Sequence, residues 1–134
     1  MVSFEKEADL TKTVRDLKIL VVEDNKAIST LLKYVLKREG YDIEVAETTQ
    51  AAQAIVDDRL HHFSLILLDL NLPGGSGFDI LDALPKENKA PVIILSALSQ
   101  TQNVIRGLES GAVDYLTKPF NPQELVLRIN KALA

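Results

Sequence analysis

Three carboxylates and one lysine each directly follow a short apolar run of this chain: Glu23, Asp24, Asp69 and Lys118. If those runs are parallel strands, the four charged side chains emerge at one edge of a sheet, where open α/β folds bind ligands. Carboxylates that lie close together raise one another's pKa, and a divalent cation removes that penalty. Oxygen ligands suit Mg²⁺, which usually binds carboxylates together with waters and phosphate oxygens. The spacing therefore predicts a magnesium and phosphate site.

Two further groups are expected at the same edge. The backbone carbonyl of Asn71, two residues beyond Asp69, would complete the metal shell, and Ser96 ends another apolar run and adds a hydroxyl. An aspartate carboxylate can attack phosphorus when cations neutralise the transferring group. Here Mg²⁺ and Lys118 would supply that charge.

Short apolar runs alternate with amphipathic segments along the chain, a pattern that predicts a parallel sheet covered by helices on both faces. The expected strands are residues 18–22, 43–45, 63–68, 92–95 and 114–116. The first helix carries one apolar stripe, formed by Ile28, Leu31, Leu32, Val35 and Leu36. The second helix begins near Thr48 or Thr49, and a short third helix is expected over residues 78–84.

The remaining segments are predicted from their turn and capping residues. Residues 71–77, with one proline and three glycines, are expected to form a flexible loop beside the site. Val104, Ile105 and Leu108 are predicted to form the inner face of the fourth helix. Asn121 is the expected N-cap of the last helix, with proline at the first helical position.

Length and composition limit the class of protein. The 134 residues fit one domain, and we expect residues 17–134 to form it, preceded by an extension over residues 1–16 that is either a tail or a short helix. The net charge of −4 gives no basic surface for direct nucleic-acid binding. The absence of cysteine excludes disulfides. No apolar run is long enough to cross a membrane, so we expect a cytoplasmic protein.

Four segments together are similar to one known family. They are residues 21–25 (VVEDN), 67–74 (LLDLNLPG), 93–97 (IILSA) and 111–120 (GAVDYLTKPF). From about Lys18 to Ala134 the chain resembles the receiver domain of two-component response regulators. The resemblance implies a CheY-like, flavodoxin-like α/β fold: a doubly wound, five-stranded parallel sheet in the order 2-1-3-4-5.

The resemblance also implies a role for each site residue. Asp69 would accept a phosphoryl group from a histidine kinase or a histidine phosphotransfer protein, while Ser96 and Lys118 contact the phosphoryl oxygens. Mg²⁺ would be held by Glu23, Asp24, Asp69 and the carbonyl of Asn71. Tyr115 would move with Ser96 to switch the surface of the fourth helix, fifth strand and fifth helix, and the Lys118–Pro119 bond would be cis.

The fourth helix and the segment through Arg128 look most like receivers of the subfamily with a winged-helix DNA-binding domain, which dimerise through that switching surface. Asp114 and Arg128 stand where the subfamily forms an ion pair between subunits. Val104 replaces a basic residue that would face Glu124, and Val113 replaces an acidic one. These two replacements count against dimerisation by that face, so a phosphorylation-dependent homodimer is one alternative for the output and an unidentified output partner is the other.

The leading interpretation is a phosphoacceptor that does not act as an enzyme on an outside substrate. Two other functions remain as alternatives. One is a receiver-like interaction module without phosphorylation. The other is a Mg²⁺-dependent phosphatase with an aspartate nucleophile, resembling the haloacid dehalogenase class; that class has a second aspartate where this chain has Asn71. Elsewhere, Arg106 and Glu109 are three residues apart on a helix and are predicted to form a solvent-exposed pair.

Overall fold

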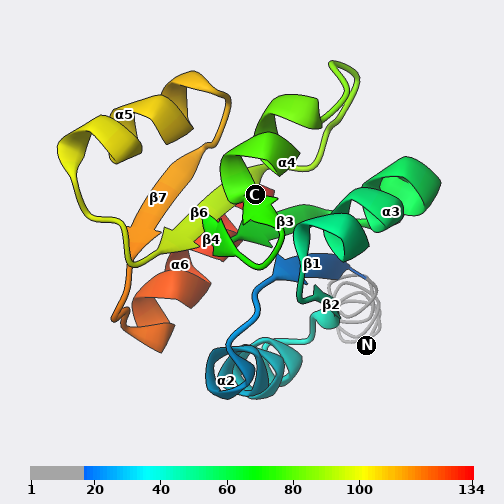
Figure 1. Ribbon diagram of the computed structural model, residues 1–134. Helices are drawn as coiled ribbons and strands as arrows, with labels where there is room; N and C mark the ends of the chain where they lie inside the picture. Colours follow the sequence, from blue (N-terminus) through cyan, green and yellow to red (C-terminus); the bar gives the residue numbers. More distant parts are fainter. Residues whose placement is uncertain (1–16) are drawn as a thin grey trace, which may run out of the picture.

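The computed structural model describes residues 17–134, and the extension expected over residues 1–16 lies outside the described residues. Five parallel strands form the main sheet in the order β2-β1-β3-β6-β7, which confirms the predicted doubly wound α/β fold (Figure 1). The strands are β1 (Lys18–Val22), β2 (Asp42–Ala46), β3 (Leu65–Leu68), β6 (Val92–Ser96) and β7 (Asp114–Thr117). The carboxyl ends of β1, β3, β6 and β7 therefore lie along one edge.

Helices cover both faces of this sheet (Figure 1). One face carries α2 (Lys26–Arg38) and α6 (Pro122–Leu133); the other carries α3 (Thr49–Arg59), α4 (Gly77–Ala83) and α5 (Thr101–Glu109). A short 3₁₀ helix, η1 (Leu60–His62), follows α3. None of the helices found between residues 17 and 134 has the length and apolar character needed to cross a bilayer.

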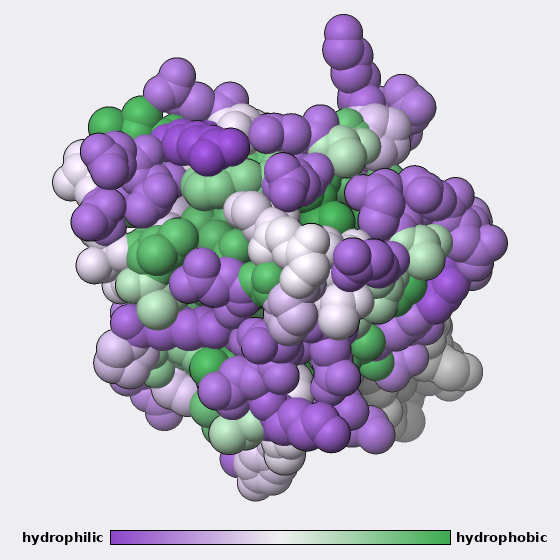
Figure 2. Space-filling model, viewed as in Figure 1, coloured by the Kyte–Doolittle hydropathy of each residue, from purple (hydrophilic) through white to green (hydrophobic). Residues whose placement is uncertain are grey.

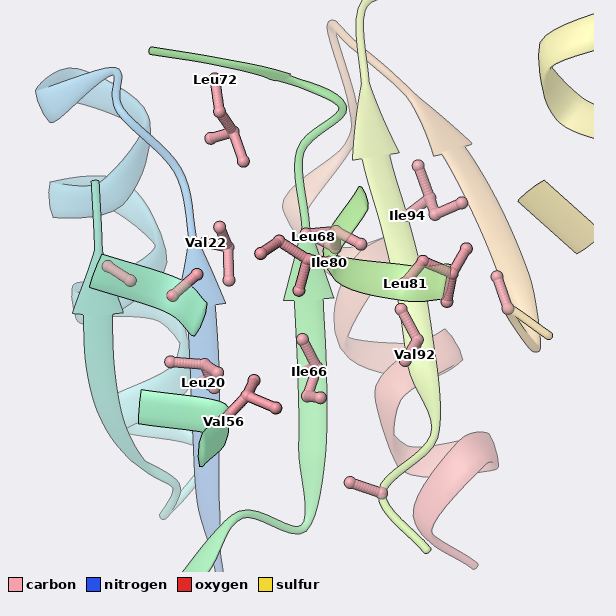
Figure 3. Packing of buried hydrophobic residues seen from close by; sticks show 14 of the residues in the cluster. Leu20, Val22, Val56, Ile66, Leu68, Leu72, Ile80, Leu81, Val92 and Ile94 are labelled. Carbon is pink, nitrogen blue, oxygen red and sulfur yellow. The ribbon is translucent and has the colours of Figure 1, made fainter. Parts of the chain in front are cut away.

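Alternate residues of the central strands divide the core into two layers. Leu20, Val22, Ile66, Leu68 and Ile94 point to the face covered by α3 and α4, as Figure 3 shows. Their sequence neighbours pack against α2 and α6 on the opposite face. Strand β3 is buried on both faces, which explains why its sequence is an unbroken apolar run. Asp69 directly follows this strand, so its position is fixed by the packing of the core.

Side-chain caps fix the starts of the helices next to the site. The side-chain oxygen of Asn25 accepts a hydrogen bond from the backbone N–H of Ile28, and Thr48 caps α3 in the same way. Asn121 accepts hydrogen bonds from two backbone N–H groups of α6, as predicted from the sequence. These caps set where each strand-to-helix connection ends and so position the strand-end residues.

The prediction of an apolar inner face on α5 was wrong for two of its three residues. Ile105 is 50% exposed and Leu108 is 44% exposed, whereas Gly107 is buried. A Cβ atom at Gly107 would lie only 2.5 Å from Ile94 Cδ1, so α5 approaches the sheet through its glycine and turns its larger apolar residues outward. Hydrophobic atoms reach the surface on the side of the molecule where α5 and β7 lie (Figure 2). Leu31 of α2, also predicted on an inward stripe, is 40% exposed.

The segment predicted as a flexible loop after Asp69 instead contains a hairpin of two short antiparallel strands, β4 (Asn71–Leu72) and β5 (Gly75–Ser76). Gly74 permits the turn because its φ is +88°, a conformation that favours glycine. The backbone N–H of Thr49, in the first turn of α3, donates to the carbonyl of Pro73 at 3.4 Å. The hairpin is therefore tied to α3 as well as to the strand that carries Asp69.

Candidate metal and phosphate site

The three predicted carboxylates meet at the carboxyl edge of the sheet. Glu23 and Asp24 follow β1, Asp69 follows the neighbouring strand β3, and one oxygen from each lies within 4.8 Å of the others. Glu23 is 2% exposed and Asp69 is 5% exposed, while Asp24 faces solvent. The cluster is thus buried on its inner side and open to water through Asp24.

Lys118 enters this cluster from the end of β7 and pairs with two of its carboxylates. Its Nζ lies 2.5 Å from Glu23 Oε1 and 3.0 Å from Asp69 Oδ2. Burial lowers the pKa of Lys118, but the hydrogen bonds to Glu23 and Asp69 outweigh it, so the net pKa is raised. The Lys118–Pro119 peptide bond is cis, as predicted. Lys118 therefore carries a full positive charge against the carboxylates at neutral pH.

Backbone N–H groups fix the remaining carboxylate oxygens. Asn25 N–H donates to Glu23 Oε2 at 3.1 Å, and Asn71 N–H donates to Asp69 Oδ1 at 3.2 Å. Burial raises the pKa of Glu23, and its bonds to Lys118 and Asn25 offset only part of that effect. Both buried carboxylates are consequently held in fixed orientations, with the second oxygen of each directed at Lys118.

Ser96 and Tyr115 both bind the backbone of Leu98, in the connection between β6 and α5. The completely buried Ser96 Oγ accepts a hydrogen bond from Leu98 N–H at 3.1 Å, and the Tyr115 hydroxyl donates to the Leu98 carbonyl at 2.5 Å. Burial raises the pKa of the Tyr115 hydroxyl, and the Ser96 hydroxyl partly offsets this. The two residues predicted to switch together are thus joined through the backbone of one residue, Leu98.

A family model described as the response regulator receiver domain matches residues 19–130. The chain belongs to this receiver domain family. Among curated relatives, the DNA-binding response regulator MtrA of Mycobacterium leprae is 43% identical over 87% of this chain and 51% of its own length. The transcriptional regulatory protein CpxR of Escherichia coli K12 is 42% identical over 87% of this chain and 49% of its own length. The chain therefore spans about half the length of these relatives.

Solved structures of receiver domains agree with this assignment. The signal receiver domain of a putative LuxO repressor from Vibrio parahaemolyticus superimposes with a TM-score of 0.81 at 33% identity, covering 87% of this chain and 89% of that one. The receiver domain of a Francisella response regulator gives a TM-score of 0.80 at 39% identity, covering 87% and 96%. The predicted CheY-like receiver fold is confirmed.

In this receiver, the predicted interface residues form an ion-pair network within one chain. Arg128 of α6 binds both carboxylate oxygens of Asp114, at 2.7 and 2.9 Å, and also binds Glu124 at 2.9 Å. Val104 is half-buried and Val113 is 56% exposed. The pairing of Asp114 with Arg128 that was predicted between subunits is therefore already made inside the protomer.

The sequence analysis missed several backbone groups that serve this receiver site. The N–H groups of Asn25 and Asn71 and the peptide of Leu98 carry no signal in residue type. Gly77 does carry a signal in its residue type, because a glycine at the start of a helix indicates a close backbone approach. In the structure, a Cβ atom there would lie 2.1 Å from the backbone oxygen of Asp69. Its close approach could have been suspected from the glycine but not located without the fold.

The donor set of this receiver fits a hard divalent cation. Glu23, Asp24 and Asp69 supply only carboxylate oxygens, which are the ligands that Mg²⁺ prefers, and no cysteine occurs in the chain. The exposed side of the cluster leaves room for waters and phosphate oxygens, which Mg²⁺ commonly keeps. An acidic site that could hold a metal ion is therefore present.

Proposed function

We propose that this receiver domain is a phosphoacceptor, with Asp69 taking the phosphoryl group from a histidine kinase or a histidine phosphotransfer protein. The observation that carries the proposal is the position of Asp69, buried between Glu23, Asp24 and Lys118 at the end of the central strand β3. A carboxylate in that setting is oriented for attack and has a cation on hand to balance negative charge on the incoming group.

The transfer balances as a displacement at phosphorus. An oxygen of Asp69 forms the new P–O bond as the P–N bond to the donor imidazole breaks, and the imidazole nitrogen takes a proton. Lys118 then exchanges its contact with the free carboxylate for one with a phosphoryl oxygen, and Ser96 donates its hydroxyl hydrogen to another. Glu23, Asp24, Asp69 and the Asn71 carbonyl would hold Mg²⁺, which supplies charge neutralisation at the phosphoryl group.

Phosphorylation would reach the surface through Ser96 and Tyr115. In the structure Ser96 Oγ accepts a hydrogen bond from Leu98 N–H, and a rotamer change that moves Oγ toward a phosphoryl oxygen would release or weaken that bond. The Tyr115 hydroxyl donates to the carbonyl of the same residue, Leu98. We therefore propose that α5, β7 and α6 form the surface that changes, with a coupling free energy of about 1–3 kcal/mol between site and surface.

The proposed partners follow from this role. The domain would assist its own phosphorylation and dephosphorylation and would not act as an enzyme on an outside substrate. The exposed Ile105, Leu108 and Val113 on the changing surface favour a protein partner there, including a second copy of the domain after phosphorylation. Since relatives of twice this length are a DNA-binding response regulator and a transcriptional regulatory protein, the output we propose is control of transcription by a longer protein or complex.

The first test is to incubate the protein with Mg²⁺ and acetyl phosphate and to measure intact mass. We expect the mass to rise by one phosphoryl group in the wild type but not in Asp69→Asn, and the gain to disappear in EDTA. Asp57→Asn, an exposed aspartate on α3, is the matched control and should be modified like the wild type. Unmodified wild-type protein that also fails to respond to beryllofluoride would favour a receiver-like interaction module.

A further inference from the structure

Arg106 of α5 lies over the aromatic ring of Phe78 at the start of α4. The guanidinium carbon is 3.9 Å from the ring centroid, well within the range of cation–π interactions. Arg106 is exposed, whereas Phe78 is 4% exposed and belongs to the core. The predicted pair with Glu109 is absent from the ion pairs found among residues 17–134, so Arg106 is directed at α4 and not along its own helix.

Helix α5 has few other attachments. Gly107 is its only buried residue, and its N-cap, Gln100, makes no side-chain capping hydrogen bond, in contrast to the N-caps of α2, α3, α4 and α6. Most helical stability in proteins comes from packing of an apolar face. Because α5 leaves Ile105 and Leu108 exposed, the contact between Arg106 and Phe78 is one of the few that tie it to α4.

Phe78 in turn is connected to the backbone around Asp69. It follows Gly77, whose N–H donates to the carbonyl of Leu70 at 2.9 Å. A Cβ atom at Gly77 would lie 2.1 Å from the carbonyl oxygen of Asp69, so the two backbone segments are in direct contact. A shift of the Phe78 backbone would therefore move Gly77 against the residues that follow β3.

We propose that Arg106 and Phe78 form a latch that couples the position of α5 to the backbone beside Asp69, with Arg106 as a positioning residue. The latch is a second connection between the site and α5, separate from the one through Ser96, Leu98 and Tyr115. Its signalling role rests on the proposed phosphorylation of Asp69, whereas the mechanical coupling exists in the unphosphorylated protein.

The coupling is tested by amide hydrogen exchange of the full chain, without phosphodonor or Mg²⁺. In Arg106→Gln we expect the amides of residues 101–109 to exchange about two- to fivefold faster, the size expected for an exposed cation–π contact. Residues 70–77 should speed up in the same direction, because the coupling is reciprocal. Arg106→Lys, which keeps a cation over the ring, should restore much of the wild-type rate in both segments.

Two further variants sharpen this test. Arg38→Gln is the matched control, because Arg38 lies over the Tyr34 ring at 5.6 Å on α2, and it should leave both segments unchanged. Phe78→Leu alone and combined with Arg106→Gln completes a double-mutant cycle, in which the double variant should exchange no faster in α5 than the faster single variant.

Wild-type exchange of α5 in Arg106→Gln would overturn the latch, as would faster exchange confined to α5 with residues 70–77 unaffected. Arg106 is exposed, so this variant decides the question even if Phe78→Leu does not fold. Failure of the phosphoacceptor proposal would appear separately, as an unchanged mass with acetyl phosphate.

Discussion

Lys118→Met tests most directly how the charges of the site are balanced. Lys118 Nζ lies 2.5 Å from Glu23 and 3.0 Å from Asp69, and the two carboxylate side chains are only 3% and 6% exposed. Removing the cation leaves these carboxylates facing each other and Asp24 with no positive partner. We expect a loss of about 3 kcal/mol in unfolding free energy, at the lower end of the range for breaking a buried ion pair. The Lys118 side chain is 14% exposed, so water relieves part of the cost.

The same variant should respond more strongly to Mg²⁺ than the wild type does. In the wild type a cation entering the site must compete with the Lys118 ammonium for Glu23 and Asp69, and in Lys118→Met that competition and the charge repulsion are gone. A tenfold gain in Mg²⁺ affinity would add about 1.4 kcal/mol of stabilisation at saturating Mg²⁺. The loss measured in EDTA should therefore shrink in Mg²⁺.

Urea unfolding followed by circular dichroism, in EDTA and in excess MgCl₂, measures both effects, since the chain has no tryptophan for fluorescence. Lys131→Met, an exposed lysine of α6 with no ion pair to any other residue of the described part, is the control and should behave as wild type. Glu23→Gln combined with Lys118→Met should recover part of the stability, because it also removes the buried charge. Equal Mg²⁺ stabilisation of wild type and Lys118→Met would refute the reasoning.

Three further predictions address positioning, pH and capping. In Gly77→Ala the new Cβ would collide with the backbone of Asp69, so we expect a loss of roughly 1–3 kcal/mol in unfolding free energy from overpacking, measured by urea unfolding. The same variant should be phosphorylated more slowly, measured by intact mass. Gly75→Ala, whose Cβ would have its nearest contact at 3.3 Å, should show neither effect. The pKa of Glu44 lies below its usual 4.5 because of its bond to Arg59, so its stabilisation is present above pH 4.5 and lost as pH falls through the lowered value. Glu44→Gln should thus lower the urea midpoint at pH 7, and by progressively less as the pH falls below 4.5; an effect that does not change with pH would contradict this. Asn121→Ala should cost about 1 kcal/mol in urea unfolding, and Asn121→Asp, which keeps the cap, much less.

The sequence predicted that the charged residues of the site meet at one edge, because their positions are fixed by features that are local in the chain. Asp69 follows a run that is buried on both faces, and Glu23 and Lys118 also end apolar runs, so a parallel sheet alone brings them to one edge. The cap at Asn121 was likewise predicted, since it depends on residues two or three positions apart, and the start of α3 was placed near Thr48 or Thr49. The burial of the strands follows from the same pattern, whereas the strand order was implied by the family resemblance.

Helix α5 could not be predicted in this way because its orientation depends on contacts distant in sequence. Its pattern gave an inward face with Ile105 and Leu108, but the close approach of Gly107 to Ile94 and Tyr115 turns that face outward. The hairpin after Asp69 was missed for a related reason: its short strands pair only with each other and are tied to α3 by Thr49.

The failure at α5 and the function proposed for it have one physical cause. A helix that buries only a glycine gains little from the hydrophobic effect, so its position is set by a few polar and aromatic contacts. Such an element can be moved by an event worth about 1–3 kcal/mol, whereas strands as buried as β3 cannot. Under the proposed function, the α5 residues whose orientation the sequence failed to predict would therefore be among those that a phosphoryl group at Asp69 affects most.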